Sequence, residues 1–238
     1  MKTRIAGTAL AAALIVYAGY AALYVAPDER TMHEVQRIFY FHVPSWITSF
    51  TAFSVVFLAN VGFLLTRRYQ WDCLGVAAAE VGVLCCTIGL ITGPLWARPV
   101  WGVWWTWDAR LTTTFILWLL YISYLLLRGL LEDPQRRAAL SAVFGIFAFL
   151  DVPLVYLSNR LWRTQHPQPV VLGGEGSGLN PTMARVLLIC VIAVFGVMIP
   201  LLIDRYRLEM VRHELDGLRQ KAEARTAASP SDSLRSQT

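Results

Sequence analysis

Four tryptophans stand within seven positions of this chain, in the segment WGVWWTWDARL that begins at Trp101. Indole rings offer large, flat, apolar surfaces, whereas a carboxylate and a guanidinium beside them can order a loop and bind charged groups. The segment therefore favours a large planar ligand that is mostly apolar and also carries charge. Its candidate binding residues are Trp101, Trp104, Trp105, Trp107, Asp108 and Arg110.

The spacing of this tryptophan cluster is compatible with a short helix. Trp101, Trp104, Trp105 and Asp108 fall at i, i+3, i+4 and i+7, so a helix would place all four on one face as a shelf. The alternative is an aromatic belt, in which tryptophans rest at the level of the lipid headgroups. We favour the ligand-binding interpretation, because four tryptophans in seven positions are more than anchoring a helix end at the headgroups needs.

Two histidines lie in segments on either side of the cluster. His42 stands in RIFYFHVPSW, just before an apolar run, and His166 stands in LWRTQHPQP, just after one. Neutral imidazoles bind iron, and two that approach from opposite sides would form the axial pair of a haem. His33 is a spare candidate, but its setting in DERTMHEV is polar and fits a solvated loop. No Cys, Asp or Glu joins the pair at a spacing typical of zinc.

Charged residues near these groups fit the same kind of ligand. Arg37, Arg98 and Arg110 could bind the two propionate carboxylates of a haem, since arginine binds carboxylates bidentately. The alternative for each arginine is contact with lipid headgroups. Glu80 and Asp151 lie inside apolar runs, where a carboxylate is costly. Asp151 could support the ligand's surroundings, and Glu80 could line a substrate route or contact a partner subunit.

The composition is that of a polytopic membrane protein. Hydrophobic residues make up 56% of the 238 positions and charged residues 16%, and the mean hydropathy is +0.49. A soluble domain of this length needs more charge on its surface. Six runs reach the roughly 20 residues that cross a bilayer. We therefore predict an all-α bundle of six transmembrane helices, at 5–25, 45–66, 73–93, 111–129, 138–157 and 183–203.

The basic residues favour cytoplasmic termini, with the tryptophan cluster and both histidines on the outer side. The first run exceeds the apolar core of a signal peptide, so we interpret it as an uncleaved span. The pI near 9.2 fits contact with anionic headgroups of the bilayer and not with nucleic acid. The cysteines form no C-x-x-C pair and fit small core residues; they are Cys73, Cys85, Cys86 and Cys190.

We divide the chain into two parts. Residues 1–203 form the predicted membrane domain, with the tryptophan-rich loop at about 94–110. Residues 204–238 form a charged cytoplasmic helix followed by a disordered tail. The run GGEGSG at 173–178 lacks the Lys and Ser/Thr of a phosphate loop, so we interpret it as a flexible loop.

The motifs resemble those of a known family. WGVWWTWDARLT resembles the WWD signature of haem-handling membrane proteins. Together with RIFYFHVPSW, GPLWARPVWG and WRTQH, it is similar to the haem exporter protein C family, also called cytochrome c-type biogenesis protein C. The resemblance extends over about residues 27–203.

This resemblance implies a haem-transfer protein of the bacterial inner membrane and not an enzyme. It implies that His42 and His166 are the axial ligands of a transiently bound haem b at the periplasmic face. The implied partners are a membrane-anchored haem chaperone, the ATPase and membrane subunits of an ABC transporter, and a small membrane subunit. The implied haem-binding residues are Trp101, Gly102, Trp104, Trp105, Trp107, Asp108, Arg37, Arg98 and Arg110.

Three residues depart from the family pattern. Leu161 stands where tryptophan is common, Pro167 follows the histidine where glutamine is frequent, and Asp151 replaces a frequent asparagine. They put the fine positioning of the His166 segment in question and leave the histidines in place. Two other functions stay open from the residues alone. One is a bis-histidine b-type cytochrome that exchanges electrons with quinone, and the other is a permease subunit whose tryptophans form a belt.

Overall fold

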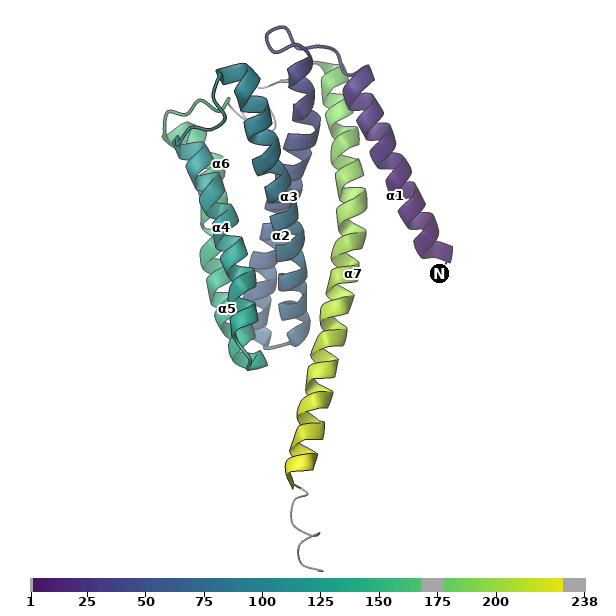
Figure 1. Ribbon diagram of the computed structural model, residues 1–238, viewed down its shortest axis with the longest axis vertical. Helices are drawn as coiled ribbons and strands as arrows, with labels where there is room; N and C mark the ends of the chain where they lie inside the picture. Colours follow the sequence, from purple (N-terminus) through teal and green to yellow (C-terminus); the bar gives the residue numbers. More distant parts are fainter. Residues whose placement is uncertain (1, 168–177, 229–238) are drawn as a thin grey trace, which may run out of the picture.

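The computed structural model describes residues 2–167 and 178–228, with the side chains described between residues 7 and 226 of these ranges. Within these ranges the chain is helical and has no strand, which confirms the all-α prediction (Figure 1). The elements are α1 (Lys2–Tyr20), a π-helical turn η1 (Ala21–Val25), a 3-10 turn η2 (Glu34–Ile38), α2 (Phe39–Thr66), α3 (Tyr69–Trp101), α4 (Ala109–Leu130), α5 (Pro134–Phe149), α6 (Asp151–Leu161) and α7 (Pro181–Ala228).

Among the residues that the structure describes, six helical segments are long and apolar enough to cross a membrane, as predicted, and the chain is a multi-pass membrane protein. The fifth segment consists of two helices, because α5 ends at Phe149 and α6 begins at Asp151. Pro153 lies in the first turn of α6. It has no N–H to donate to the Phe149 carbonyl four residues earlier, which accounts for the break.

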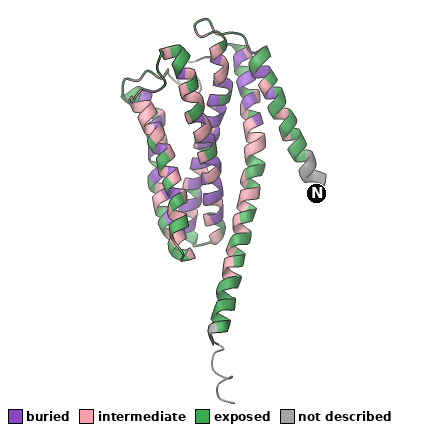
Figure 2. Ribbon diagram, viewed as in Figure 1, coloured by how far each residue is buried: buried purple, intermediate pink, exposed green. Residues whose placement is uncertain are grey.

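The centre of the bundle is the α2–α3 pair, where buried residues concentrate (Figure 2). A Cβ at Gly89 of α3 would lie 2.5 Å from the ring of Trp46 on α2, so glycine permits the close approach. From α4, Tyr121 stacks on Phe53 of α2 with ring centroids 3.6 Å apart. All four cysteines are buried thiols, as predicted for core residues.

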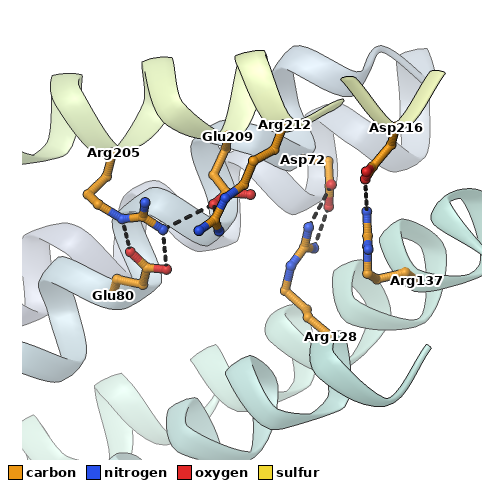
Figure 3. A network of polar contacts seen from close by, with 8 residues as sticks. All are labelled: Asp72, Glu80, Arg128, Arg137, Arg205, Glu209, Arg212 and Asp216. Atoms are coloured by element: carbon orange, nitrogen blue, oxygen red, sulfur yellow. Dashed lines mark hydrogen bonds and ion pairs between the residues drawn. The ribbon is translucent and has the colours of Figure 1, made fainter. Parts of the chain in front are cut away.

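Ion pairs join α7 to the bundle near the N-terminal half of α3, away from the tryptophan loop that follows this helix (Figure 3). Arg205 of α7 binds both carboxylate oxygens of Glu80 on α3 and lies 3.0 Å from Glu209. Glu80, for which a substrate route or a partner contact was expected, is thus paired within the chain. Arg128 of α4 binds Asp72 of α3 at 2.6 and 2.8 Å. These contacts hold α3, α4 and α7 together at this end.

Helix α7 continues without a break from the apolar segment into the charged one. Its 48 residues correspond to about 72 Å at 1.5 Å per residue. The helix therefore passes straight through residue 203, and the division into two domains there stays a prediction. The expected disordered tail lies largely outside the described residues, as does nearly all of the expected flexible loop at 173–178.

The three predicted ligand-bearing segments meet at one end of the bundle. The connections before α2, between α3 and α4, and after α6 all lie at the end opposite the chain's N-terminus and the lower part of α7 (Figure 1). The fold therefore brings the two histidines and the tryptophan cluster to a common end. Which side of the membrane this end faces stays a prediction.

Candidate functional site

His42 lies one turn inside α2, and not before the span as the sequence suggested. The difference arises because η2 leads directly into α2, so the helix begins several residues before the apolar run. The residue is 8% exposed. Trp46 and Trp96 stand edge-on to its ring, with centroids 6.1 and 5.8 Å away. His42 therefore occupies an aromatic pocket between α2 and α3.

Both ring nitrogens of His42 have hydrogen-bonding partners. The indole N–H of Trp46 donates to Nε2 at 3.2 Å. Nδ1 lies 2.9 Å from Oγ1 of Thr92 on α3. The sequence did not identify Thr92, which is a single polar residue in an apolar run. The signal for Trp46 was its position four residues after His42, which puts both on one face of a helix.

His166 lies in the segment that follows α6 and is partly exposed. Asn159 at the end of α6 anchors this segment by donating to the carbonyls of His166 at 3.2 Å and Pro167 at 2.8 Å. The His166 Nδ1 lies 2.8 Å from the Pro167 carbonyl, which can only accept. Nδ1 therefore carries the proton in the neutral ring, and Nε2 carries the lone pair.

Electrostatics keep His166 neutral. Burial and the neighbouring Arg110 guanidinium lower the pKa of His166 to about 4. The imidazole is therefore uncharged at pH 7, the form that can bind a metal. His42, His166 and Arg110 are close enough to interact electrostatically, so the fold brings the two predicted iron ligands into one region.

The tryptophan-rich loop is not a helix, so the predicted single face is wrong. Trp101 is the last residue of α3. Gly102 adopts a left-handed conformation with φ +78° and ends the helix, with its N–H bonded to the Arg98 carbonyl at 3.0 Å. The chain then runs without helical structure to Asp108, and Trp104 and Trp105 leave the face of Trp101.

The indole rings do not form one flat shelf. Trp105 and Trp107 stand at 75° with centroids 5.8 Å apart, and both pack edge-on to Phe115 of α4. Trp104 and Trp107 are the outward rings, 57% and 73% exposed. Trp105 points inward, and its buried Nε1 has no hydrogen-bonding partner within the described chain. The loop therefore offers two exposed indole rings and one inward N–H.

Asp108 joins the two loops of the site. Its carboxylate accepts from the N–H of Leu111 at 3.0 Å and so caps the N-terminus of α4. It also accepts from Oγ1 of Thr106 at 3.1 Å and from the N–H of Gln165 at 3.2 Å. Gln165 is the residue before His166, a connection that the sequence did not reveal. Asp108 thus orders its own loop, as expected, and also holds the His166 segment.

The three predicted carboxylate-binding arginines differ in their surroundings. Arg37 already has an acidic partner, since its Nη2 lies 3.0 Å from Asp28. Arg98 donates to the Gly102 carbonyl and lies over the Trp104 ring at 6.0 Å. Arg110 donates to the Val155 carbonyl at 2.5 Å and thereby joins α4 to α6. Arg98 and Arg110 bind backbone carbonyls and lie beside the cluster, so they fit the predicted role better than Arg37.

Other predicted residues lie at the margin of the site or outside it. His33 is exposed in the connection before α2, as its polar setting indicated. Asp151 is buried at the start of α6, and its Oδ2 has no hydrogen-bonding partner among the described residues. A hollow of about 770 Å³ runs along the segment from Asn159 to Pro167 and includes His166.

Comparison with known proteins gives consistent matches over most of the chain. A family model described as Heme exporter protein C matches residues 2–221. A protein of Bradyrhizobium diazoefficiens named Heme exporter protein C is 32% identical over 222 residues, 93% of this chain and 84% of the relative. One of the same name from Haemophilus influenzae is 30% identical over 204 residues, 86% and 83% of the two chains. A putative cytochrome c biosynthesis ccmC-like mitochondrial protein of Marchantia polymorpha is 31% identical over 170 residues, 71% and 72%.

Proposed function

Because the chain belongs to the Heme exporter protein C family, we propose that it binds haem and acts in haem export for cytochrome c biogenesis. The binding site is the end of the bundle that carries the tryptophan loop and the His166 segment. One observation carries this assignment. Asp108 holds these two segments together at the end of the bundle where His42 lies, so two imidazoles and the exposed indoles share one region.

His42 and His166 would hold the iron through Nε2. The donor set fits this role, because Nδ1 of each ring has an oxygen partner and Nε2 carries the lone pair, which at His42 accepts from the Trp46 indole N–H. The macrocycle would lie against the exposed rings of Trp104 and Trp107. Trp101, Gly102 and Trp105 would shape the loop. Arg98 and Arg110 would bind the propionates, and Arg37 would contribute only if it left Asp28.

The finer steps of the proposal rest on the position of the site and on what the family resemblance implies. A haem b at the rim of the bundle can be released, so the protein would be a transfer platform and not an enzyme. It would present haem at the periplasmic face of a bacterial inner membrane to a membrane-anchored haem chaperone, with both termini in the cytoplasm. An ABC transporter, comprising ATPase and membrane subunits, and a small membrane subunit would complete the assembly.

A competition experiment tests transient binding. Purified protein loaded with haem is mixed with an excess of apomyoglobin, and the transfer of haem is followed by its Soret absorbance. We expect complete transfer on mixing, and faster transfer from His42→Ala and His166→Ala. His33→Ala is the matched control, because this exposed histidine lies outside the site, and it should transfer at the wild-type rate. Haem that stays with the wild-type protein would contradict a transfer platform.

A b-type cytochrome that exchanges electrons with quinone is the second candidate. The burial of His42 inside α2 favours it, because such cytochromes hold haem between helices. The position of His166 in a partly exposed segment favours release. Reversible reduction by quinol without haem loss to apomyoglobin would support the cytochrome, whereas haem loss without quinol turnover would support export.

A further inference from the structure

A chain of three hydrogen bonds holds His42 and crosses from α2 to α3. The Trp46 Nε1 lies 3.2 Å from the His42 Nε2. The His42 Nδ1 lies 2.9 Å from Oγ1 of Thr92. That oxygen in turn lies 2.8 Å from the carbonyl oxygen of Ile88, one turn earlier in α3. Each atom of the chain is at a normal hydrogen-bonding distance from the next.

The chemistry of the groups determines where each proton lies. An indole N–H can only donate, so the His42 Nε2 must accept and carries a lone pair. The neutral imidazole therefore has its proton on Nδ1, which donates to the Thr92 oxygen. The Thr92 hydroxyl can accept this bond, because its own proton is donated to the Ile88 carbonyl. In this arrangement the Trp46 indole N–H, the His42 Nδ1–H and the Thr92 hydroxyl each have an acceptor. A proton on Nε2 would instead point at the indole N–H, and neither group could accept.

Gly89 of α3 gives the Trp46 indole its place. A Cβ at position 89 would lie 2.5 Å from Cε2 and 2.6 Å from Nε1 of Trp46, which is closer than real side chains approach. The indole N–H therefore rests against the α3 backbone. Gly89 and Thr92 are three residues apart on one face of α3. A single helix face thus positions both partners of His42.

We propose that Thr92 accepts the Nδ1 proton of His42 and so orients the imidazole for iron, and that Trp46 caps the ligating nitrogen until iron takes the place of the indole N–H. The inference rests on the proposed function, since it takes His42 as an iron ligand. A hydrogen bond from Nδ1–H orients a ligating imidazole and raises its basicity, so Thr92 strengthens the iron bond. The Trp46 bond exists only without iron, so it competes with binding and makes His42 an exchangeable ligand.

The tautomer is measured on the haem-free, full-length protein in detergent micelles. The ¹⁵N spectrum of histidine-labelled protein distinguishes a protonated from an unprotonated ring nitrogen, and the His42 signals are those that vanish in His42→Gln. We expect the Nδ1 of His42 to be protonated and its Nε2 to be unprotonated. A proton on Nε2 would overturn the inference. Because no haem is present, failure of the proposed function would leave this result standing.

Haem titrations test the roles of Thr92 and Trp46, because removing the two side chains should change haem affinity in opposite directions. Thr92→Val removes the acceptor and should weaken haem binding by about 10- to 100-fold. Thr92→Ser keeps the hydroxyl and should bind as the wild type does. Trp46→Phe removes the competing donor and should tighten binding by roughly 2- to 10-fold, the equivalent of one hydrogen bond.

A merely structural role would weaken binding in both Thr92→Val and Trp46→Phe, and that outcome would overturn the inference. Thermal unfolding and elution volume verify that each variant is folded. If Trp46→Phe does not fold, Gly89→Ala displaces the indole from the other side and should likewise tighten binding. Weaker haem binding in a folded Gly89→Ala variant would contradict the proposal that Trp46 caps the His42 Nε2.

Discussion

The carboxylate of Asp108 accepts a hydrogen bond from the backbone N–H of Gln165 at 3.2 Å. These residues are 57 positions apart and belong to the two loops that form the rim of the site. The same carboxylate caps α4. One side chain therefore caps α4 and, together with Asn159, holds the segment that carries His166.

Replacing Asp108 should affect both stability and haem binding. Asp108→Ala loses the helix cap, which costs about 1 kcal/mol. It also removes the contact that ties the His166 segment to the tryptophan loop and leaves only the Asn159 anchor, so haem affinity should fall by about tenfold or more. The matched control is Asp133→Ala, because Asp133 caps α5 through the Arg136 N–H far from the site. It should cost similar stability in thermal unfolding and leave the haem titration unchanged. Equal haem affinity in the two variants would contradict the linking role of Asp108.

A side chain at Gly102 should destabilise the turn that ends α3. Nothing lies within 4 Å of a Cβ placed there, so the cost of Gly102→Ala comes from its φ of +78° and not from a clash. We expect destabilisation by about 1–2 kcal/mol and a displaced tryptophan loop. Gly129→Ala within α4 is the control and should stabilise slightly, by about 0.5–1 kcal/mol. Chemical unfolding of both variants gives the comparison, and the same sign for both would refute the argument.

The ion pair of Arg128 with Asp72 should contribute to the stability of the fold and not to haem affinity (Figure 3). The two side chains are only 10% and 14% exposed, so removing one partner leaves a buried charge and costs about 3–5 kcal/mol. Arg128→Met should therefore lower the unfolding temperature markedly, with normal haem affinity at low temperature. Arg207→Gln is the control, since its contact with Asp204 is exposed and is worth less than about 1 kcal/mol.

The outward tryptophans should contribute to binding more than to folding. Trp107 is 73% exposed, so Trp107→Ala removes little packing. It should weaken haem binding by about 0.5–1.5 kcal/mol, as expected for an aromatic contact, with unfolding nearly unchanged. Tyr24→Ala is the control, because Tyr24 is 75% exposed on η1 and lies outside the tryptophan loop. Unaltered haem affinity in Trp107→Ala would mean that the macrocycle lies elsewhere.

The sequence predicted what depends on composition and short-range pattern. The six spans follow from runs of apolar residues, and the loop-ordering role of Asp108 follows from a carboxylate placed directly after the tryptophans. That Asp108 also caps α4 came from the structure. The helical face from Trp101 to Asp108 was wrong, because the left-handed turn at Gly102 overrides the spacing. The contact between Thr92 and His42 depends on how α2 and α3 pack, 50 residues apart. No local pattern encodes that pairing.

The visible spectrum of the purified, haem-loaded protein tests the central claim most directly. The wild type and His33→Ala should show a six-coordinate, low-spin haem, because two imidazoles hold the iron. His42→Ala and His166→Ala should each lose this species or convert it to a weaker five-coordinate form. Spectra of both variants that equal the wild-type spectrum would contradict the assignment of His42 and His166 as the iron ligands.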